Sequence, residues 1–124
     1  MSIHWKSFQC VVNYEFNKTE KGTFMKTGIE IIAEERKRQI EVEGWTAEKD
    51  DLYTVGQLAL AGATYAIPTF CRDDYGGFSY LTDAPIMFPF SSEWWKPTPD
   101  DRIRELAKAG ALIAAEIDRL QRLK

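Results

Sequence analysis

The sequence predicts a mainly α-helical domain, because three threonines open segments with helical start signals. Thr27 and Thr54 each precede a Glu or Gln by three residues, which is the spacing of a capping box. Thr98 precedes Pro99 and two aspartates, so proline would occupy the first helical position and acid the positive end of the helix dipole. The expected helices cover residues 28–43, 55–66 and 99–122.

The residues that end these segments and the residues on their faces also indicate a mainly α-helical fold. Gly44 is a suitable left-handed cap for the first helix, and Pro68 would stop the second. The second helix is rich in small residues, which allows another helix to approach closely. In the third, apolar residues recur at three- and four-residue steps around the small Gly110: Ile103, Leu106, Ile113, Ile117 and Leu120. This stripe could pack against the core or against a second copy of the chain.

Residues 5–16 alternate apolar and polar side chains, with Phe8, Cys10 and Val12 on one side, and predict a short half-buried β-strand. A polar stretch with a glycine follows, and Met25 stands directly before the first helix. Met25 is therefore an alternative start to Met1. Residues 1–24 are therefore either an N-terminal extension outside the core or a strand that belongs to it, and we expect residues 25–124 to form a single helical ligand-binding domain.

Residues 69–97 form a long segment that is too aromatic for a disordered chain and too rich in Gly and Pro for regular structure. Long loops in compact domains usually carry function. The segment is either a lid over a pocket or an apolar cover for the open end of the helices.

Composition narrows the classes of function. A net charge of -3 over 124 residues argues against a protein whose main task is to bind nucleic acid. Two distant cysteines and one histidine indicate neither a zinc site nor a disulfide scaffold, and no metal or other cofactor is expected. No apolar run is long enough for a membrane span, so we expect no membrane partner and a cytoplasmic location.

The run from residue 33 to residue 51 gathers a guanidinium at Arg38, an indole at Trp45 and carboxylates at Asp50 and Asp51. An arginine fork suits phosphate and an indole offers a stacking face, although the charges could instead line a solvated helix face with Trp45 as a core anchor. Further cations and aromatic rings lie downstream, and together they suit a nucleotide-like ligand. The candidate ligand-binding residues are Arg38, Trp45, Asp50, Asp51, Tyr65, Trp94, Trp95, Lys96 and Arg102.

Catalytic chemistry has less support in the sequence. A magnesium-dependent pyrophosphohydrolase needs carboxylates from at least two helices, and the first helix supplies Glu30, Glu34 and Glu35. The second helix supplies none. The single histidine, His4, lies in the N-terminal extension, and Ser79, Ser91 and Ser92 have no base nearby in sequence. Cys71 in an aromatic segment is more typical of packing than of nucleophilic catalysis. Whether the protein is an enzyme is therefore left open, with binding favoured.

From Thr27 to Lys124 the sequence resembles a family of small bacteriophage and prophage proteins of mostly unassigned function, in AEERKRQIEVEGWTAEKDD, QLALAGATYA and WWKPTPDDRIRELAKAGALIAAEIDRL. It is more remotely similar to the ryanodine-receptor repeat (RyR) domain. That resemblance covers arginine before GW, paired Asp, Tyr and Pro, then Lys and DR before a Leu-rich helix. The matching positions are Arg38, Gly44, Trp45, Asp50, Asp51, Lys96, Asp101 and Arg102.

Weaker similarity to MazG-like nucleotide pyrophosphohydrolases lies in the ERKRQ segment and the last helix. The RyR resemblance implies a nucleotide-derived ligand, and the phage resemblance implies sequestration of a host defence signalling nucleotide in the bacterial cytoplasm. The alternatives are a MazG-like hydrolase and a protein-protein interaction module that uses Trp94 and Trp95 as hot spots.

Overall fold

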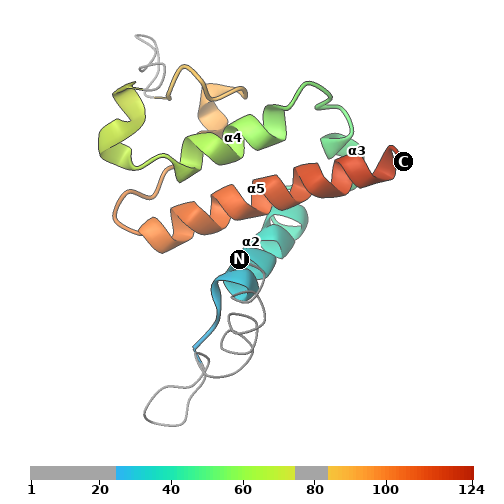
Figure 1. Ribbon diagram of the computed structural model, residues 1–124, viewed down its shortest axis with the longest axis horizontal. Coiled ribbons are helices and arrows are strands. Elements are labelled where there is room, and N and C mark those ends of the chain that lie inside the picture. Colours follow the sequence, from blue (N-terminus) through green and yellow to red (C-terminus); the bar gives the residue numbers. More distant parts are fainter. Residues whose placement is uncertain (1–24, 75–83) are drawn as a thin grey trace, which may run out of the picture. The chain divides into compact units, whose positions relative to one another are not determined.

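The computed structural model describes residues 25–74 and 84–124, and within these ranges it contains four α-helices and no β-strand (Figure 1). The α-helices are α2 (Gly28–Glu41), α3 (Ala47–Asp50), α4 (Gln57–Ala66) and α5 (Arg102–Arg122), and two short 3-10 helices are η2 (Thr69–Asp74) and η3 (Ser92–Trp94). The mainly helical class is thus confirmed. The strand expected at residues 5–16 lies outside the described residues. The chain divides into two units, Met1–Ile31 and Ile32–Lys124.

Helix α2 begins with the predicted capping box. The Thr27 amide donates to Glu30 Oε1 over 3.0 Å, and the Glu30 amide donates to Thr27 Oγ1 over 3.2 Å. These bonds, led by the one from the Thr27 amide, lower the pKa of the Glu30 carboxyl. The helix ends at Glu41, two residues before the predicted end, and Gly44 adopts the left-handed conformation with φ 78°.

Two helix starts differ from the prediction. Helix α4 begins at Gln57 after Gly56, whose φ of 88° is left-handed, and the Gln57 side chain accepts from the Val55 amide over 2.9 Å, so the predicted Thr54 box is wrong. Helix α5 begins at Arg102 because Asp101 caps it by accepting from the Arg104 amide over 3.1 Å. The turn that starts with Thr98 lies just outside the helix.

Short helix α3 was absent from the prediction. Thr46 caps it by accepting from the Lys49 amide over 3.4 Å. Four residues are too few for a helical period to be visible in the sequence. The helix carries Lys49 and Asp50 into the same region as the end of α2.

Helices α4 and α5 pack closely, as the small residues of α4 predict. A side chain at Gly62 would come within 2.9 Å of the Ala109 carbonyl oxygen and 3.0 Å of Ile113 Cγ1. The buried hydrophobic positions of α5 are nearly all alanine: Ala107, Ala109, Ala111, Leu112 and Ala115. Small side chains on both helices therefore allow a short interhelical distance.

The aliphatic stripe of α5 is only partly buried. Its members Ile103, Leu106, Ile113, Ile117 and Leu120 are 43% to 65% exposed. Paired charges occupy the buried side together with the alanines, for example Glu116 and Arg119, whose atoms Oε1 and Nε are 2.6 Å apart. Two positions of the stripe still contact other helices, because Ile113 lies against Gly62 of α4 and Gly110 lies against Ile32 of α2. Of the two roles that the sequence left open, packing within the chain is thus met in part, and association with a second copy stays a prediction.

Aromatic rings supply the volume that the alanines of α5 do not. Phe88 is buried with Leu58, Tyr65 and Leu112, and Trp95 stacks on Tyr65 with ring centroids 4.6 Å apart. The segment from residue 84 to 97 thus packs on the helices as a cover. One edge of the same segment also borders a pocket, through Trp94 and Lys96, and its role as a lid stays a prediction.

Candidate functional site

A cavity of about 510 Å³ opens between the end of α2, the short helix α3 and the aromatic segment, which is the name used below for residues 84–97. It is large enough for a ligand of nucleotide size. The lining residues combine three cations, one carboxylate, three aromatic rings and one aliphatic side chain: Arg38, Lys49, Lys96, Glu43, Trp45, Tyr53, Trp94 and Val42. All of them belong to the unit Ile32–Lys124.

The aromatic wall of the pocket is held by contacts between rings. Trp45 meets Trp94 edge-on, with centroids 5.5 Å apart and planes at 79°, and it meets Phe90 at 5.1 Å. Tyr53 packs against the same Phe90 at 4.9 Å. Trp94 is still 39% exposed. The indole rings of Trp45 and Trp94 therefore line the cavity and are held in place by the neighbouring rings.

Arg38 is committed to two carboxylates. Its Nε and Nη2 donate to the two oxygens of Glu35 over 2.9 and 2.6 Å, and Nη2 also lies 2.6 Å from Glu43 Oε2. The hydrogen bond with Glu35 is the main cause of a raised pKa of the Arg38 guanidinium. One guanidinium thus pairs with two carboxylates, and Arg38 is held in place as part of the pocket wall.

Lys49 and Lys96 supply the available positive charge. Both side chains are exposed, and neither forms an ion pair with a carboxylate in residues 25–74 or 84–124. Their backbones are fixed, since the Lys49 amide donates to the Thr46 side chain and the Lys96 amide donates to Tyr65 Oη over 2.9 Å. The pocket mouth therefore carries two ammonium groups on anchored backbones beside exposed indole.

A small chamber of about 30 Å³ lies deeper, next to the main cavity. Gln39 and Lys108 line it, and both are buried. Lys108 Nζ donates to the Lys96 carbonyl over 2.5 Å, while burial, followed by the charge of Arg104, lowers the pKa of Lys108. Gln39 Oε1 is buried without a hydrogen-bond partner among the described residues. The chamber is polar and large enough for one water molecule.

Four of the nine predicted ligand-binding residues line the main cavity: Arg38, Trp45, Trp94 and Lys96. Tyr65 lies beneath it as part of the inner chamber, and burial raises the pKa of its phenol to about 12. Trp95 is half-buried, stacked on Tyr65 on one side with the Arg72 guanidinium 5.1 Å from its ring centroid.

The predicted aspartates have partners elsewhere. Asp50 is fully buried, and its Oδ2 accepts from Arg36 Nη2 over 2.8 Å. Burial raises the pKa of the Asp50 carboxyl, against the opposing effect of Arg36. Asp51 is exposed and accepts from Arg122 Nη2 over 2.7 Å. Neither aspartate lines the pocket, and Asp50 instead ties the α3 turn to α2.

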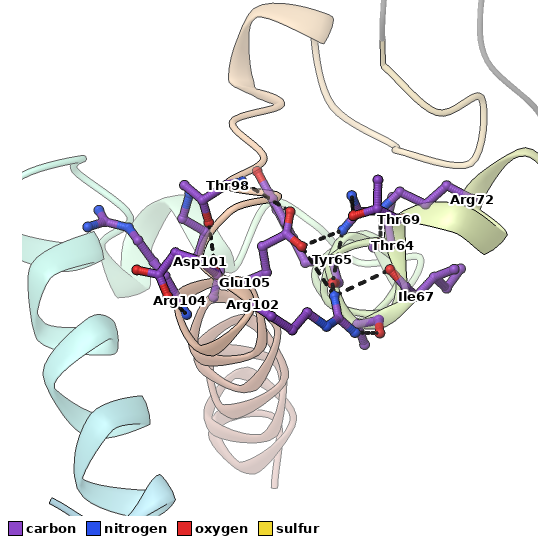
Figure 2. A network of polar contacts seen from close by, with 12 residues as sticks. Thr64, Tyr65, Ile67, Thr69, Arg72, Thr98, Asp101, Arg102, Arg104 and Glu105 are labelled. Atoms are coloured by element: carbon purple, nitrogen blue, oxygen red, sulfur yellow. Dashed lines mark hydrogen bonds and ion pairs between the residues drawn. The ribbon is translucent and has the colours of Figure 1, made fainter.

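Arg102 also lies outside the pocket, in the polar network of Figure 2. It donates to the last carbonyl groups of α4, at Tyr65, Ala66 and Ile67. Arg102 Nη1 also lies 3.2 Å from Oε1 of the fully buried Glu105, and Arg72 Nη2 lies 3.1 Å from the same oxygen. The arrangement gives Arg102 a structural role in ending α4.

Lys49 and Tyr53 were missed by the sequence-based list although both line the cavity. Lys49 lies between two predicted residues, Trp45 and Asp50, so its positive charge at this position could have marked it as a ligand-binding candidate. Tyr53 carried no such signal, because its contact with Phe90 depends on a segment far away in sequence.

No protein-family model matches the chain, and no curated protein or solved structure is significantly similar to it. Within the described ranges, no group of three or more His, Cys, Asp or Glu side chains is placed to hold a metal ion. In the same ranges no helix combines the length and apolarity needed to cross a bilayer. The geometry of the pocket is therefore the basis for a functional proposal.

Proposed function

We propose that this protein binds a nucleotide-derived small molecule in the pocket between Trp45, Trp94 and the two lysines. The observation that supports this most is the pairing of exposed indole with two ammonium groups that have no carboxylate partner among the described residues. A base is planar and apolar on its faces, and a phosphate is anionic, so a nucleotide matches both parts of the site.

The charge balance of the lining favours an anion. Arg38, Lys49 and Lys96 contribute three positive charges, and Glu43 contributes one negative charge. Because Arg38 is shared between Glu35 and Glu43, these three groups together carry one negative charge, and the two lysines supply the positive potential of the pocket. Phosphate contacts of this kind weaken as salt concentration rises, since the groups are exposed to solvent.

The resemblance to phage proteins extends the proposal to sequestration of a signalling nucleotide from a bacterial host, and this part rests on the residue pattern alone. Binding without turnover is favoured because Glu35, the buried acid of α2, is occupied by Arg38 and Gln39. The protein-protein alternative would require Trp94 and Trp95 together on the surface, and only Trp94 is exposed.

Isothermal titration calorimetry with purine mono- and triphosphates and cyclic dinucleotides, in EDTA and then in magnesium, tests the proposal. We expect at least one ligand to bind in EDTA and to be recovered intact by chromatography. Replacing both Lys49 and Lys96 by Ala should weaken that ligand at least about tenfold, or 1.4 kcal/mol. The control Lys37→Ala removes one positive charge from an exposed side chain of α2 outside the pocket and should leave affinity unchanged.

Two results would overturn the proposal. One is the absence of binding tighter than about 1 mM across the panel. The other is equal affinity of the double-lysine variant and the wild-type chain. Release of pyrophosphate in magnesium would instead support the hydrolase alternative.

A further inference from the structure

The inner chamber adjoins the main cavity where the aromatic and cationic parts of the pocket meet. The two spaces share five lining residues: Arg38, Glu43, Trp45, Trp94 and Lys96. The chamber has a volume of about 30 Å³, which is room for one water molecule or one small group of a ligand. A ligand in the main cavity can therefore place a single polar group in it.

Gln39 brings a hydrogen-bond acceptor to this chamber. Its side chain is 4% exposed, and its Oε1 has no hydrogen-bond partner among the described residues. The orientation of the amide follows from Glu35, because Nε2 donates to Glu35 Oε2 over 3.5 Å and the opposite orientation would place the amide oxygen against a carboxylate. A buried carbonyl oxygen without a donor is unfavourable, so a group that donates a hydrogen bond would be stabilised here.

Lys108 brings the complementary donor. Its side chain is also buried, and Nζ donates one hydrogen to the Lys96 carbonyl oxygen over 2.5 Å. Nζ also lies 5.6 Å from the ring centroid of Tyr65, but within residues 25–74 and 84–124 it forms no second hydrogen bond. The amino group of Lys108 can therefore donate to an occupant of the chamber.

The rest of the lining offers few other partners. Glu35, Arg38 and Glu43 are paired with one another, and the remaining side chains are mainly aromatic rings and aliphatic groups. Gln39 and Lys108 therefore determine which hydrogen bonds an occupant forms. The preferred occupant donates to the first residue and accepts from the second.

A hydroxyl group meets both conditions with a single oxygen atom, because it donates its hydrogen and accepts through its lone pairs. A phosphate or carbonyl oxygen only accepts, and it would meet Gln39 Oε1 without a hydrogen between them. In a nucleotide the sugar hydroxyls lie between the base and the phosphate. The chamber correspondingly adjoins both the indole rings of Trp45 and Trp94 and the cationic residue Lys96.

We propose that the inner chamber binds a sugar hydroxyl of the ligand, which donates to Gln39 Oε1 and accepts from Lys108 Nζ, so that the protein selects ribonucleotides over deoxyribonucleotides. This inference rests on the proposed function and specifies the ligand class of the same site. A hydroxyl reproduces both hydrogen bonds that a water molecule in the chamber would form, whereas the methylene group of a deoxy sugar reproduces neither.

Isothermal titration calorimetry of the full chain tests the inference with ligands that differ by one hydroxyl. ATP and GTP are each compared with their 2′-deoxy and 3′-deoxy analogues, and cyclic di-AMP is compared with its 2′-deoxy analogue. We expect a ribonucleotide that binds to lose at least about tenfold in affinity when the hydroxyl that occupies the chamber is removed. This comparison uses the wild-type chain and does not depend on the folding of a variant.

Two variants test whether the chamber causes the preference. Gln39→Met removes the acceptor at similar side-chain volume, so it should bind the ribonucleotide and its deoxy analogue alike, and Lys108→Met should also reduce the preference. Gln121→Met is the matched control, because Gln121 is exposed on α5, and it should keep the preference. Circular dichroism should show that the variants are folded.

The outcomes separate this inference from the proposed function. Equal affinity for each ribonucleotide that binds and its deoxy analogues would overturn this inference alone. A preference that persists unchanged in a folded Gln39→Met or Lys108→Met variant would do the same. Failure of every nucleotide to bind would overturn the proposed function together with this inference.

Discussion

Glu105 holds together three segments of the chain, so its replacement by Gln should strongly destabilise the fold. The side chain is fully buried. Its Oε2 accepts from the Thr98 amide over 3.0 Å, and its Oε1 lies 3.1 Å from Arg72 Nη2 and 3.2 Å from Arg102 Nη1 (Figure 2). Glutamine keeps the shape and removes the charge, which leaves two guanidinium groups without a counter-ion and directs an amide NH₂ toward donors.

Breaking one side of a buried ion pair costs about 3–5 kcal/mol, and a conservative amide should fall near the lower value, about 3 kcal/mol. For a chain of this length that corresponds to a fall in Tm of roughly 10 °C. Urea unfolding followed by far-ultraviolet circular dichroism measures the change. Glu93→Gln is the matched control, because Glu93 is exposed on η3, and it should shift the free energy of unfolding by less than about 0.5 kcal/mol. If Glu105→Gln also lies within that margin, the buried network does not support the fold in the way argued above.

Three further predictions concern packing, ion pairing and pH. Gly62→Ala should lower the free energy of unfolding in urea by about 1–3 kcal/mol, because the added methyl group meets a backbone carbonyl. The control Gly28→Ala has open space around it and should not lower that free energy. Equal effects of the two changes would contradict the close packing of α4 on α5. Asp50→Ala should cost about 3 kcal/mol by leaving Arg36 unpaired, and the added change Arg36→Met should recover part of the loss; strictly additive losses would show that the pair is not coupled. Ultraviolet titration should show that Tyr65 ionises near pH 12, identified by its loss in Tyr65→Phe. Because the folded chain holds this proton more tightly than the unfolded chain, the contribution of Tyr65 to stability should fall between pH 10 and about pH 12, and titration at an ordinary pH would refute its burial.

Local signals in the sequence predicted the helices well where the deciding contacts are also local. The capping box at Thr27 and the left-handed Gly44 need only neighbouring residues, and both are observed. The start of α5 was placed too early because Thr98 and Asp101 are both acceptable caps. The structure uses Asp101, and the Thr98 amide is instead bonded to Glu105, a contact that sequence spacing could not reveal.

The face of α5 shows the limit of periodicity as an argument. A helical stripe identifies a surface that needs burial and does not state against what. In α5 the stripe packs on its own chain only in part, with Ile113 against Gly62 and Gly110 against Ile32. The rings from residues 84–97, chiefly Phe88 and Trp95, fill the core over the alanines instead. Ring contacts between segments so far apart depend on tertiary structure.

Part of the pocket could also be predicted. Arg38, Trp45, Trp94 and Lys96 were expected to bind ligand, and the structure brings them around one cavity. Arg102 was predicted with them because the sequence does not distinguish an arginine that binds a phosphate from one that caps the end of a helix.

The termination of α4 has a consequence for how the chain folds. Its last carbonyls are satisfied by Arg102 from α5 and by Arg72 from η2, whose Nε and Nη2 reach the Thr64 and Tyr65 carbonyls over 3.4 and 3.3 Å. The final turn of this helix therefore gains its partners only when segments from both sides of it have docked. Helix formation and tertiary assembly are joined in a single cooperative step, and the amide protons of α4 and of the first turns of α5 should exchange with solvent together through one opening event.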